Sequence, residues 1–136
     1  MFELEIPGLE PLGPADAPTV PPFKTQLLKW IGNKQRFAHE IASYFPRMTE
    51  DQTYFEPFLG SAAVLGTLQP QRAIGSDVFE PLVGIWQCLR RDPDELVGWY
   101  ADRWTRFNAV DDRRSVYEDI KSSYNAEPNA ADLLFL

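Results

Sequence analysis

The sequence predicts an α/β fold in its first half, a short parallel sheet with helices on its faces, followed by an all-helical second half. Two short β-prone runs, at residues 53–58 and 73–76, are separated by a helical segment. An amphipathic helix follows the second run, and the order strand, helix, strand, helix favours parallel strands. From residue 92 onward the apolar spacing is helical. At 136 residues the chain has room for one compact domain.

Composition divides the chain into three regions. Residues 1–22 contain six of the twelve prolines and little apolar periodicity, so we expect a Pro-rich leader that is extended or disordered. Residues 23–91 form the predicted α/β part. Residues 92–136 form the helical part.

The α/β part begins with a helix and a glycine turn. Phe37, Ile41 and Phe45 fall at helical spacing and predict a helix over residues 34–45. The first strand is then followed by Gly60 and a short helix over residues 61–68. A strand that leads through a glycine turn into a helix is a common cradle for a nucleotide-like ligand, because the backbone approaches closely there.

Four helices are predicted after the second strand. The first runs over residues 79–89, and the second begins after the N-cap Asp92 and ends near residue 107. The third spans about 112–124, and AADLLFL at 130–136 opens a fourth. Its apolar end has no cap or charged stop, so we expect the chain to be cut there or covered by another polypeptide.

The net charge, the lone histidine and cysteine, and the lack of a long apolar run each argue against a class of protein. The net charge of −7 argues against a chain that wraps nucleic acid with its whole surface. Arginines nevertheless cluster in the second half of the chain. They could form a basic surface, or they could be ordinary solvent-exposed residues of helices. His39 and Cys88 are single, so we expect no metal site and no internal disulfide. No apolar run is long enough for a membrane span, and we expect a cytoplasmic protein.

Three pieces of the sequence could converge on one ligand. Trp30 and Lys34 lie in a basic and aromatic block before the first helix, Gly60 forms the turn, and Asp77 ends the second strand. An acidic residue at that strand end is well placed to bind ribose hydroxyls. Each residue also has a purely structural alternative: Lys34 as a solvated charge, Trp30 as a core aromatic, and Asp77 as a helix cap.

Three sequence blocks, in their order and their residues, resemble those of the adenine-specific DNA methyltransferases of the DNA adenine methylase type. LLKWIGNK is similar to the family's Lys-Trp-x-Gly-Gly-Lys block, FEPFLGSAAV to its cofactor loop, and GSDVFEPLVGIW to its Ser-Asp-x-Asn-x-x-Leu block. The resemblance runs from about residue 23 to 136. It implies a Rossmann-like class I methyltransferase fold followed by a helical DNA-recognition insertion.

The resemblance also implies a cofactor and site residues. S-adenosylmethionine would be bound by Trp30 and Lys34 at its methionyl end, by Phe58 and Gly60 along the cradle, and by Asp77 at its ribose. Double-stranded DNA would be the partner. Its phosphates would be contacted by late arginines, Arg103, Arg106, Arg113 and Arg114.

Two glycines of the family pattern are replaced here. Asn33 stands where the family has the second glycine of Gly-Gly, and Ala62 stands where it has the second glycine of Gly-x-Gly. Alanine is small and asparagine tolerates left-handed backbone, so we expect both changes to preserve the shape.

The family's catalytic tetrapeptide, Asp-Pro-Pro-Tyr or a near relative, does not occur in the sequence. The one Pro-Pro pair, Pro21 and Pro22, follows Val20 and precedes the fold. We therefore assign no catalytic residue and interpret the chain as the N-terminal, donor-binding half of the enzyme. We expect it to be inactive alone and to require a complementary C-terminal half.

Two alternatives stay open. The first is a non-catalytic interaction or regulatory module on the same scaffold. The second is a dinucleotide-binding oxidoreductase fragment, which predicts a full Gly-x-Gly-x-x-Gly that FLGSAAVLG does not supply.

Overall fold

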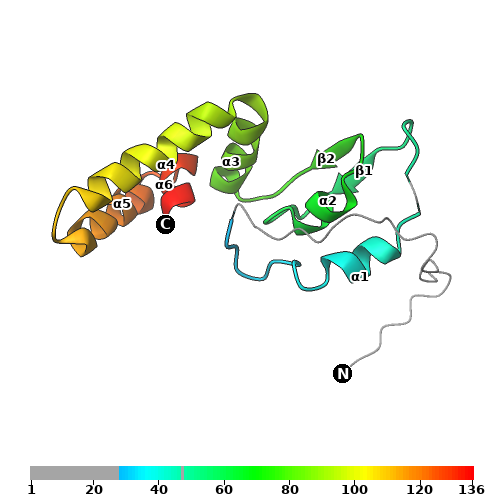
Figure 1. Ribbon diagram of the computed structural model, residues 1–136, viewed down its shortest axis with the longest axis horizontal. Coiled ribbons are helices and arrows are strands. Elements are labelled where there is room, and N and C mark those ends of the chain that lie inside the picture. Colours follow the sequence, from blue (N-terminus) through cyan, green and yellow to red (C-terminus); the bar gives the residue numbers. More distant parts are fainter. Residues whose placement is uncertain (1–27, 47) are drawn as a thin grey trace, which may run out of the picture. The chain divides into compact units, whose positions relative to one another are not determined.

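The computed structural model describes residues 28–46 and 48–136, so the predicted leader at 1–22 lies outside the described residues. The chain separates into two compact units, Met1–Ser76 and Asp77–Leu136. Figure 1 shows the strands in the first unit and helices alone in the second. Each unit is described by itself below.

The first unit contains a two-stranded parallel sheet in its described part. Strand β1 (Tyr54–Glu56) pairs with β2 (Ala73–Gly75) in parallel, and helix α2 (Ala63–Leu68) connects them. The predicted strand–helix–strand order and the parallel pairing are confirmed. The strands are shorter than predicted at 53–58 and 73–76. Pro57 contributes to this, because it has no N–H to continue the ladder.

Helix α1 (Ala38–Ser43) is shorter than the predicted helix over 34–45. The residues before it form turns instead. Gly32 has φ +73°, and the Asn33 side chain donates to the Trp30 carbonyl at 2.8 Å and accepts from the Gln35 amide at 3.1 Å. Asparagine side chains compete in this way with helical hydrogen bonds, which delays the start of the helix.

The core of the first unit lies where α1 packs against α2 and where aromatic rings meet the sheet. Phe45, just after α1, places its ring edge-on to Tyr54 of β1 with 5.6 Å between the ring centroids. The buried apolar residues of this unit are Leu28, Ala38, Ala42, Tyr54, Leu59, Ala63 and Val64.

The turn between β1 and α2 has left-handed backbone at two positions. Gly60 has φ +50° and Ala62 has φ +54°. Ala62 is therefore the N-cap of α2, and the helix begins at Ala63 rather than at the predicted residue 61. Because the alanine Cβ makes left-handed backbone unfavourable by roughly 1–2 kcal/mol, Ala62 adopts this conformation at a cost in stability.

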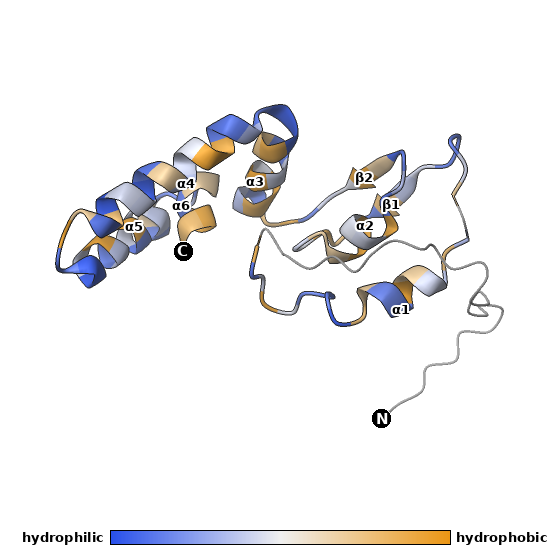
Figure 2. Cartoon of the chain, viewed as in Figure 1, coloured by the Kyte–Doolittle hydropathy of each residue, from blue (hydrophilic) through white to orange (hydrophobic). Residues whose placement is uncertain are grey.

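The second unit contains four helices in the order that the sequence predicts. They are α3 (Glu80–Arg91), α4 (Pro93–Asn108), α5 (Arg113–Ala126) and α6 (Ala130–Phe135). Figure 2 shows hydrophobic and hydrophilic residues alternating along α3 and α4, and a largely hydrophobic α6. The buried apolar residues here are Leu82, Ile85, Cys88, Leu96 and Ile120.

Three of these helices begin at a capping side chain. Asp92 accepts from the Glu95 amide at 3.0 Å, which confirms the predicted N-cap of α4. Asp112 caps α5 through the Ser115 amide, and Asn129 caps α6 through the Asp132 amide. Each cap supplies an acceptor to one of the unpaired amides of the first turn.

Helix α6 is the centre of the second unit, since it packs against α3, α4 and α5. A Cβ at Gly84 of α3 would lie 3.0 Å from the Ala130 Cβ, so glycine permits the close approach of α6. Asp132 of α6 is only 4% exposed and accepts from Arg103 Nε of α4 at 2.8 Å and from Asn129 at 2.8 Å. Although burial raises the pKa of Asp132, these hydrogen bonds outweigh it and hold that pKa below its ordinary value.

The described chain thus combines helices with a small parallel sheet. The boundary between the units falls after Ser76, so α3 groups with the helices that follow it. The sequence interpretation had placed its change of region after residue 91. No helix in the described ranges is long and apolar enough to cross a membrane.

Replacing Ala62 by glycine should stabilise the first unit. Glycine removes roughly 1–2 kcal/mol of left-handed strain and costs about 0.5–1 kcal/mol of backbone entropy, so we expect a net gain of up to about 1.5 kcal/mol. The neighbouring Ala63→Gly change is the matched control, and it should destabilise because Ala63 is helical and 4% exposed. Urea unfolding measures both. A loss of stability in Ala62→Gly would contradict the strained turn.

Candidate functional site

The segment before α1 lies against the turn that follows β1. Lys34 Nζ donates a hydrogen bond to the Phe58 carbonyl at 3.3 Å, across 24 residues of sequence. A Cβ at Gly60 would lie 3.6 Å from Trp30 Cδ1, so the edge of the indole ring lies next to the glycine. The structure therefore brings together four of the five residues that the resemblance assigned to the donor: Trp30, Lys34, Phe58 and Gly60.

Both segments of this site carry exposed apolar side chains, and they are less exposed where they meet. The Phe58 side chain is 76% exposed, and Ile31 in the opposing segment is 97% exposed. Trp30 and Gly60, where the two segments meet, are half-buried. The site thus combines a half-buried contact between the segments with exposed apolar side chains beside it.

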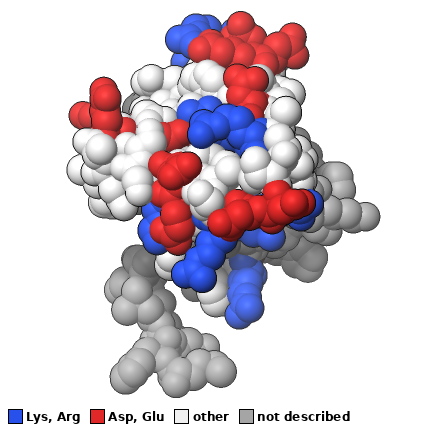
Figure 3. Space-filling model, turned by 90° about the vertical axis from the view of Figure 1, so that its left-hand side faces the viewer, with Lys and Arg blue, Asp and Glu red and all other residues white. Residues whose placement is uncertain are grey.

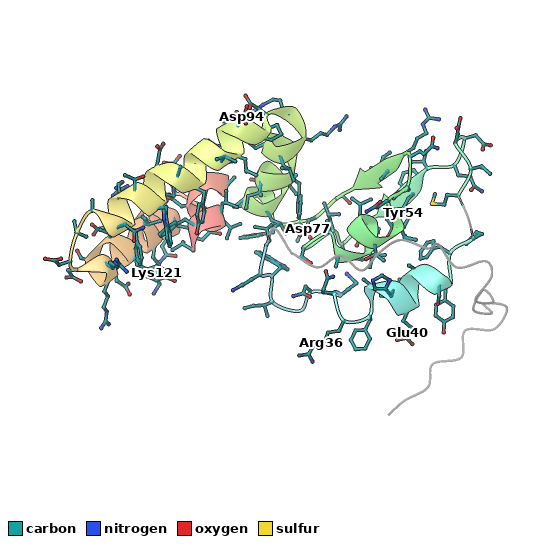
Figure 4. All side chains as sticks on the ribbon, in the orientation of Figure 1. Arg36, Glu40, Tyr54, Asp77, Asp94 and Lys121 are labelled. Carbon is teal, nitrogen blue, oxygen red and sulfur yellow. The ribbon has the colours of Figure 1, made fainter. Side chains whose placement is uncertain are left out.

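Asp77 follows the last residue of the first unit. Ser76 donates from its amide to the Glu56 carbonyl at 2.9 Å and accepts from the Leu59 amide at 2.9 Å. The chain therefore leaves the sheet at the end where the Gly60 turn begins. Asp77 Oδ1 accepts from the Phe79 amide at 3.1 Å, just before α3 (Figure 4). One carboxylate oxygen thus closes a turn before α3, whose N-cap is Phe79 rather than Asp77.

A further residue of this site, Glu56, was not singled out by the sequence. It lies on β1, is 7% exposed, and points to the same side of the strand as Tyr54. Its Oε2 accepts from the Leu65 amide at 3.1 Å and from the Tyr54 hydroxyl at 3.3 Å. The available signal was a carboxylate in an apolar strand, one residue before the proline that ends it.

Burial dominates the electrostatics around Glu56. It raises the pKa of this carboxyl, while the Leu65 amide, the Tyr54 hydroxyl and the Lys34 charge act in the opposite direction. Burial, the Glu56 charge and their hydrogen bond together raise the pKa of Tyr54 to about 12. Perturbed groups of this kind gather at functional sites.

The late arginines differ in their surroundings. Arg103 is bound to Asp132 and donates to the Trp99 carbonyl at 3.0 Å, so its guanidinium holds α4 to α6. The Arg113 guanidinium lies 5.8 Å from the centroid of the Phe107 ring. Arg106, at the end of α4, and Arg114, at the start of α5, are exposed.

Acidic residues outnumber basic ones in the helical part of the chain. Residues 92–136 contain ten Asp or Glu and five Lys or Arg, a net charge of −5. Figure 3 shows acidic and basic side chains interspersed over the face that it presents. Residues 23–91 contain six acidic and eight basic residues, a net charge of +2.

Comparison with known proteins assigns the family. Residues 30–135 match the D12 class N6 adenine-specific DNA methyltransferases. The chain belongs to that family. The match includes Trp30, Lys34, Phe58 and Gly60 of the first unit and the helices α3 to α6 of the second. Methyltransferases of this family use S-adenosylmethionine as the methyl donor and adenine in DNA as the acceptor.

A curated relative agrees with this assignment. The Type II methyltransferase M1.LlaDCHI of Lactococcus lactis subsp. cremoris is 25% identical over 95 residues, 70% of this chain and 31% of the relative. The chain therefore aligns with about a third of that relative's length. No solved structure matches the chain.

Proposed function

We propose that this chain is the S-adenosylmethionine-binding part of a site-specific DNA adenine-N6 methyltransferase. The packing of Trp30 and Lys34 on residues 58–60 carries the proposal, and membership of the D12 family supports it. On this proposal the small sheet is the start of a Rossmann-like class I methyltransferase fold. The helices from residue 92 are the start of a DNA-recognition insertion.

The residues present suit this donor. The Lys34 ammonium would pair with the methionyl carboxylate, beside the Trp30 ring, and Phe58 with the Gly60 backbone would line the cradle. Asp77 would accept hydrogen bonds from the ribose hydroxyls. When bound, S-adenosylmethionine supplies a methyl group on a positively charged sulfur. The role of this chain is to bind and orient that donor.

The group that would activate the acceptor is proposed to lie on another polypeptide or segment. The sequence has no Asp-Pro-Pro-Tyr, the block that by family resemblance would bind the flipped adenine and its amino group. An aromatic amine is a weak nucleophile, so hydrogen bonds that draw electron density onto it are needed for methyl transfer. We call this chain together with a polypeptide that carries such a block the assembled enzyme, and we propose that it acts in the cytoplasm.

Loss of Lys34 should weaken donor binding. A charge-assisted hydrogen bond contributes roughly 1.5–3 kcal/mol, so Lys34→Ala should raise the Kd for S-adenosylmethionine by about 10- to 100-fold. The control is Arg36→Ala, which removes the same charge from a nearby side chain that points away from the strands (Figure 4) and should leave the Kd unchanged. Asp77→Ala should also weaken binding. Calorimetry on the chain and on the assembled enzyme makes the measurement.

Two outcomes would redirect this assignment. If neither the chain nor the assembled enzyme binds S-adenosylmethionine, the donor site is wrong. If the assembly forms normally without donor binding, the protein is instead a non-catalytic interaction or regulatory module on a methyltransferase scaffold.

Methyl transfer should require the complementary polypeptide. The chain purified alone should transfer no label from S-adenosylmethionine to adenine in DNA, because it has no group to activate the adenine amine. Intact mass spectrometry of the complex from its source should find a second polypeptide with Asp-Pro-Pro-Tyr or a close variant. Appreciable methylation by the chain alone would refute the split arrangement.

DNA phosphates would be contacted by exposed arginines at the turn between α4 and α5. Arg106 and Arg114 are the strongest candidates, Arg113 is shared with the Phe107 ring, and Arg103 is engaged with Asp132. The excess of acidic side chains around them limits this surface to a few local contacts. Such contacts position DNA without reading its sequence.

The salt dependence of DNA binding tests these contacts. In the assembled enzyme, Arg106→Ala and Arg114→Ala should each reduce the slope of log K against log salt by about 0.9, one phosphate contact. Lys121→Ala is the control, since Lys121 lies on α5 3.6 Å from Glu118 (Figure 4) and should not change the slope. Unchanged slopes in both arginine variants would remove this surface from the DNA interface.

A further inference from the structure

Helix α4 carries an exposed apolar stripe. Val97, Tyr100 and Trp104 recur three and four residues apart, which places them on one face of the helix. These residues are 64%, 42% and 49% exposed. Another face of α4, which includes Leu96 at 4% exposure, packs within the unit. The stripe is therefore largely open to solvent in the part of the chain that the structure describes.

A cluster of aromatic rings extends the stripe to α6. Tyr100 stacks on Trp104 and Trp104 stacks on Phe107, with 5.9 Å between the ring centroids in both pairs. The Phe135 ring of α6 lies 6.0 Å from Tyr100 and 5.7 Å from Phe107. We call Val97 and these four aromatic residues the aromatic surface. Because the rings hold one another in place, the aromatic surface is ordered before a partner binds.

The residues of the aromatic surface suit an interface between proteins. Adjoining apolar groups of this size are uncommon on the surface of soluble monomers and mark interaction sites. Tyrosine and tryptophan are enriched among the residues that contribute most to binding. Rings that are already packed together lose little conformational freedom when a partner covers them. The aromatic surface therefore fits a partner with an apolar face.

Charge distinguishes the partners that could cover this surface. Residues 92–136, which form the surface, carry a net charge of −5. This excess repels DNA phosphates, and it also repels a second copy of the same helices. Arg106, which is proposed to contact DNA, is placed by helical spacing on the side of α4 opposite Trp104. The charge favours a polypeptide whose apolar segment is flanked by Lys or Arg.

The length of the curated relative indicates where such a polypeptide comes from. The chain aligns with 31% of M1.LlaDCHI, so about two thirds of that relative lie outside the alignment. Donor and acceptor must meet in one site for methyl transfer, so the parts of such an enzyme have to pack together. A helix face that is apolar and open to solvent is suited to that contact.

We propose that the aromatic surface is the docking site for the complementary methyltransferase polypeptide, which covers Tyr100 and Trp104 with an apolar segment flanked by Lys or Arg. This inference rests on the proposed function, because it assumes a second polypeptide. It adds the place on this chain where that polypeptide binds and the chemistry of the segment that binds there.

Substitutions on the stripe test the docking site. The probe is the second polypeptide that intact mass spectrometry identifies in the complex from its source, purified separately and titrated into this chain. Trp104→Gln should raise its Kd about 30-fold, because a central ring is lost. Val97→Lys should raise the Kd about tenfold, because it buries a charge in an apolar contact. Val110→Lys is the matched control, since Val110 is exposed outside α4, and it should leave the Kd unchanged.

Urea unfolding of the chain alone separates docking from folding. Val97→Lys should keep the wild-type midpoint, because Val97 is 64% exposed and lysine suits a helix at least as well as valine. Trp104→Gln loses ring contacts within the unit, so Val97→Lys decides the test if Trp104→Gln unfolds. The Kd of either variant for S-adenosylmethionine should be unchanged, because the aromatic surface contains none of the proposed donor residues.

The outcomes distinguish this inference from the proposed function. If Val97→Lys and Trp104→Gln bind the second polypeptide as tightly as the wild-type chain does, the docking site is wrong and the proposed function stands. If the chain alone sediments as a dimer that Trp104→Gln dissociates, the partner is a second copy, and the inference is wrong. Loss of DNA binding with assembly intact would also contradict it. If the complex contains no second polypeptide, the split arrangement is wrong together with the docking site, whereas donor binding by the chain is still measured by calorimetry.

Discussion

The proposed donor site depends on the contact between the segment before α1 and the turn after β1. Lys34 reaches the Phe58 carbonyl, and the edge of Trp30 lies beside Gly60. Neither segment has regular secondary structure, so these contacts, with the internal hydrogen bonds of each turn, position the exposed groups around the site. A change that displaces one segment would remove half of the groups proposed to bind the donor.

The turn itself is held at some cost in stability. Ala62 adopts left-handed backbone, and burial raises the pKa of the Glu56 carboxyl. Strained or buried groups of this kind persist where the surrounding structure enforces them, often at functional sites. Here the enforcement comes from the parallel ladder on one side and the Leu65 amide on the other.

The helical unit depends on the packing of α6 and on a buried ion pair. Helix α6 has only six residues and packs against three other helices, and its one buried carboxylate is satisfied by Arg103 and Asn129. Removing one partner of a buried pair leaves an uncompensated charge, so Arg103 has a structural role in holding α4 to α6. Charge counting along the sequence grouped Arg103 with the other late arginines, because it cannot distinguish a paired guanidinium from an exposed one.

The sequence by itself determined the order of the helices and strands, the parallel pairing and the family, because apolar periodicity, capping residues and motif blocks are local signals. Asp92 was recognisable as a cap for that reason. The tertiary structure decided the length of α1, the pairing of Arg103 with Asp132, and the role of Glu56 as a cap for α2. The length of α1 follows from the local hydrogen bonds of Asn33. The other two depend on groups further apart in sequence: Arg103 and Asp132 are 29 residues apart, and Glu56 and Leu65 are nine apart. Burial and hydrogen bonding between distant residues arise only when the chain folds, and no local pattern encodes them.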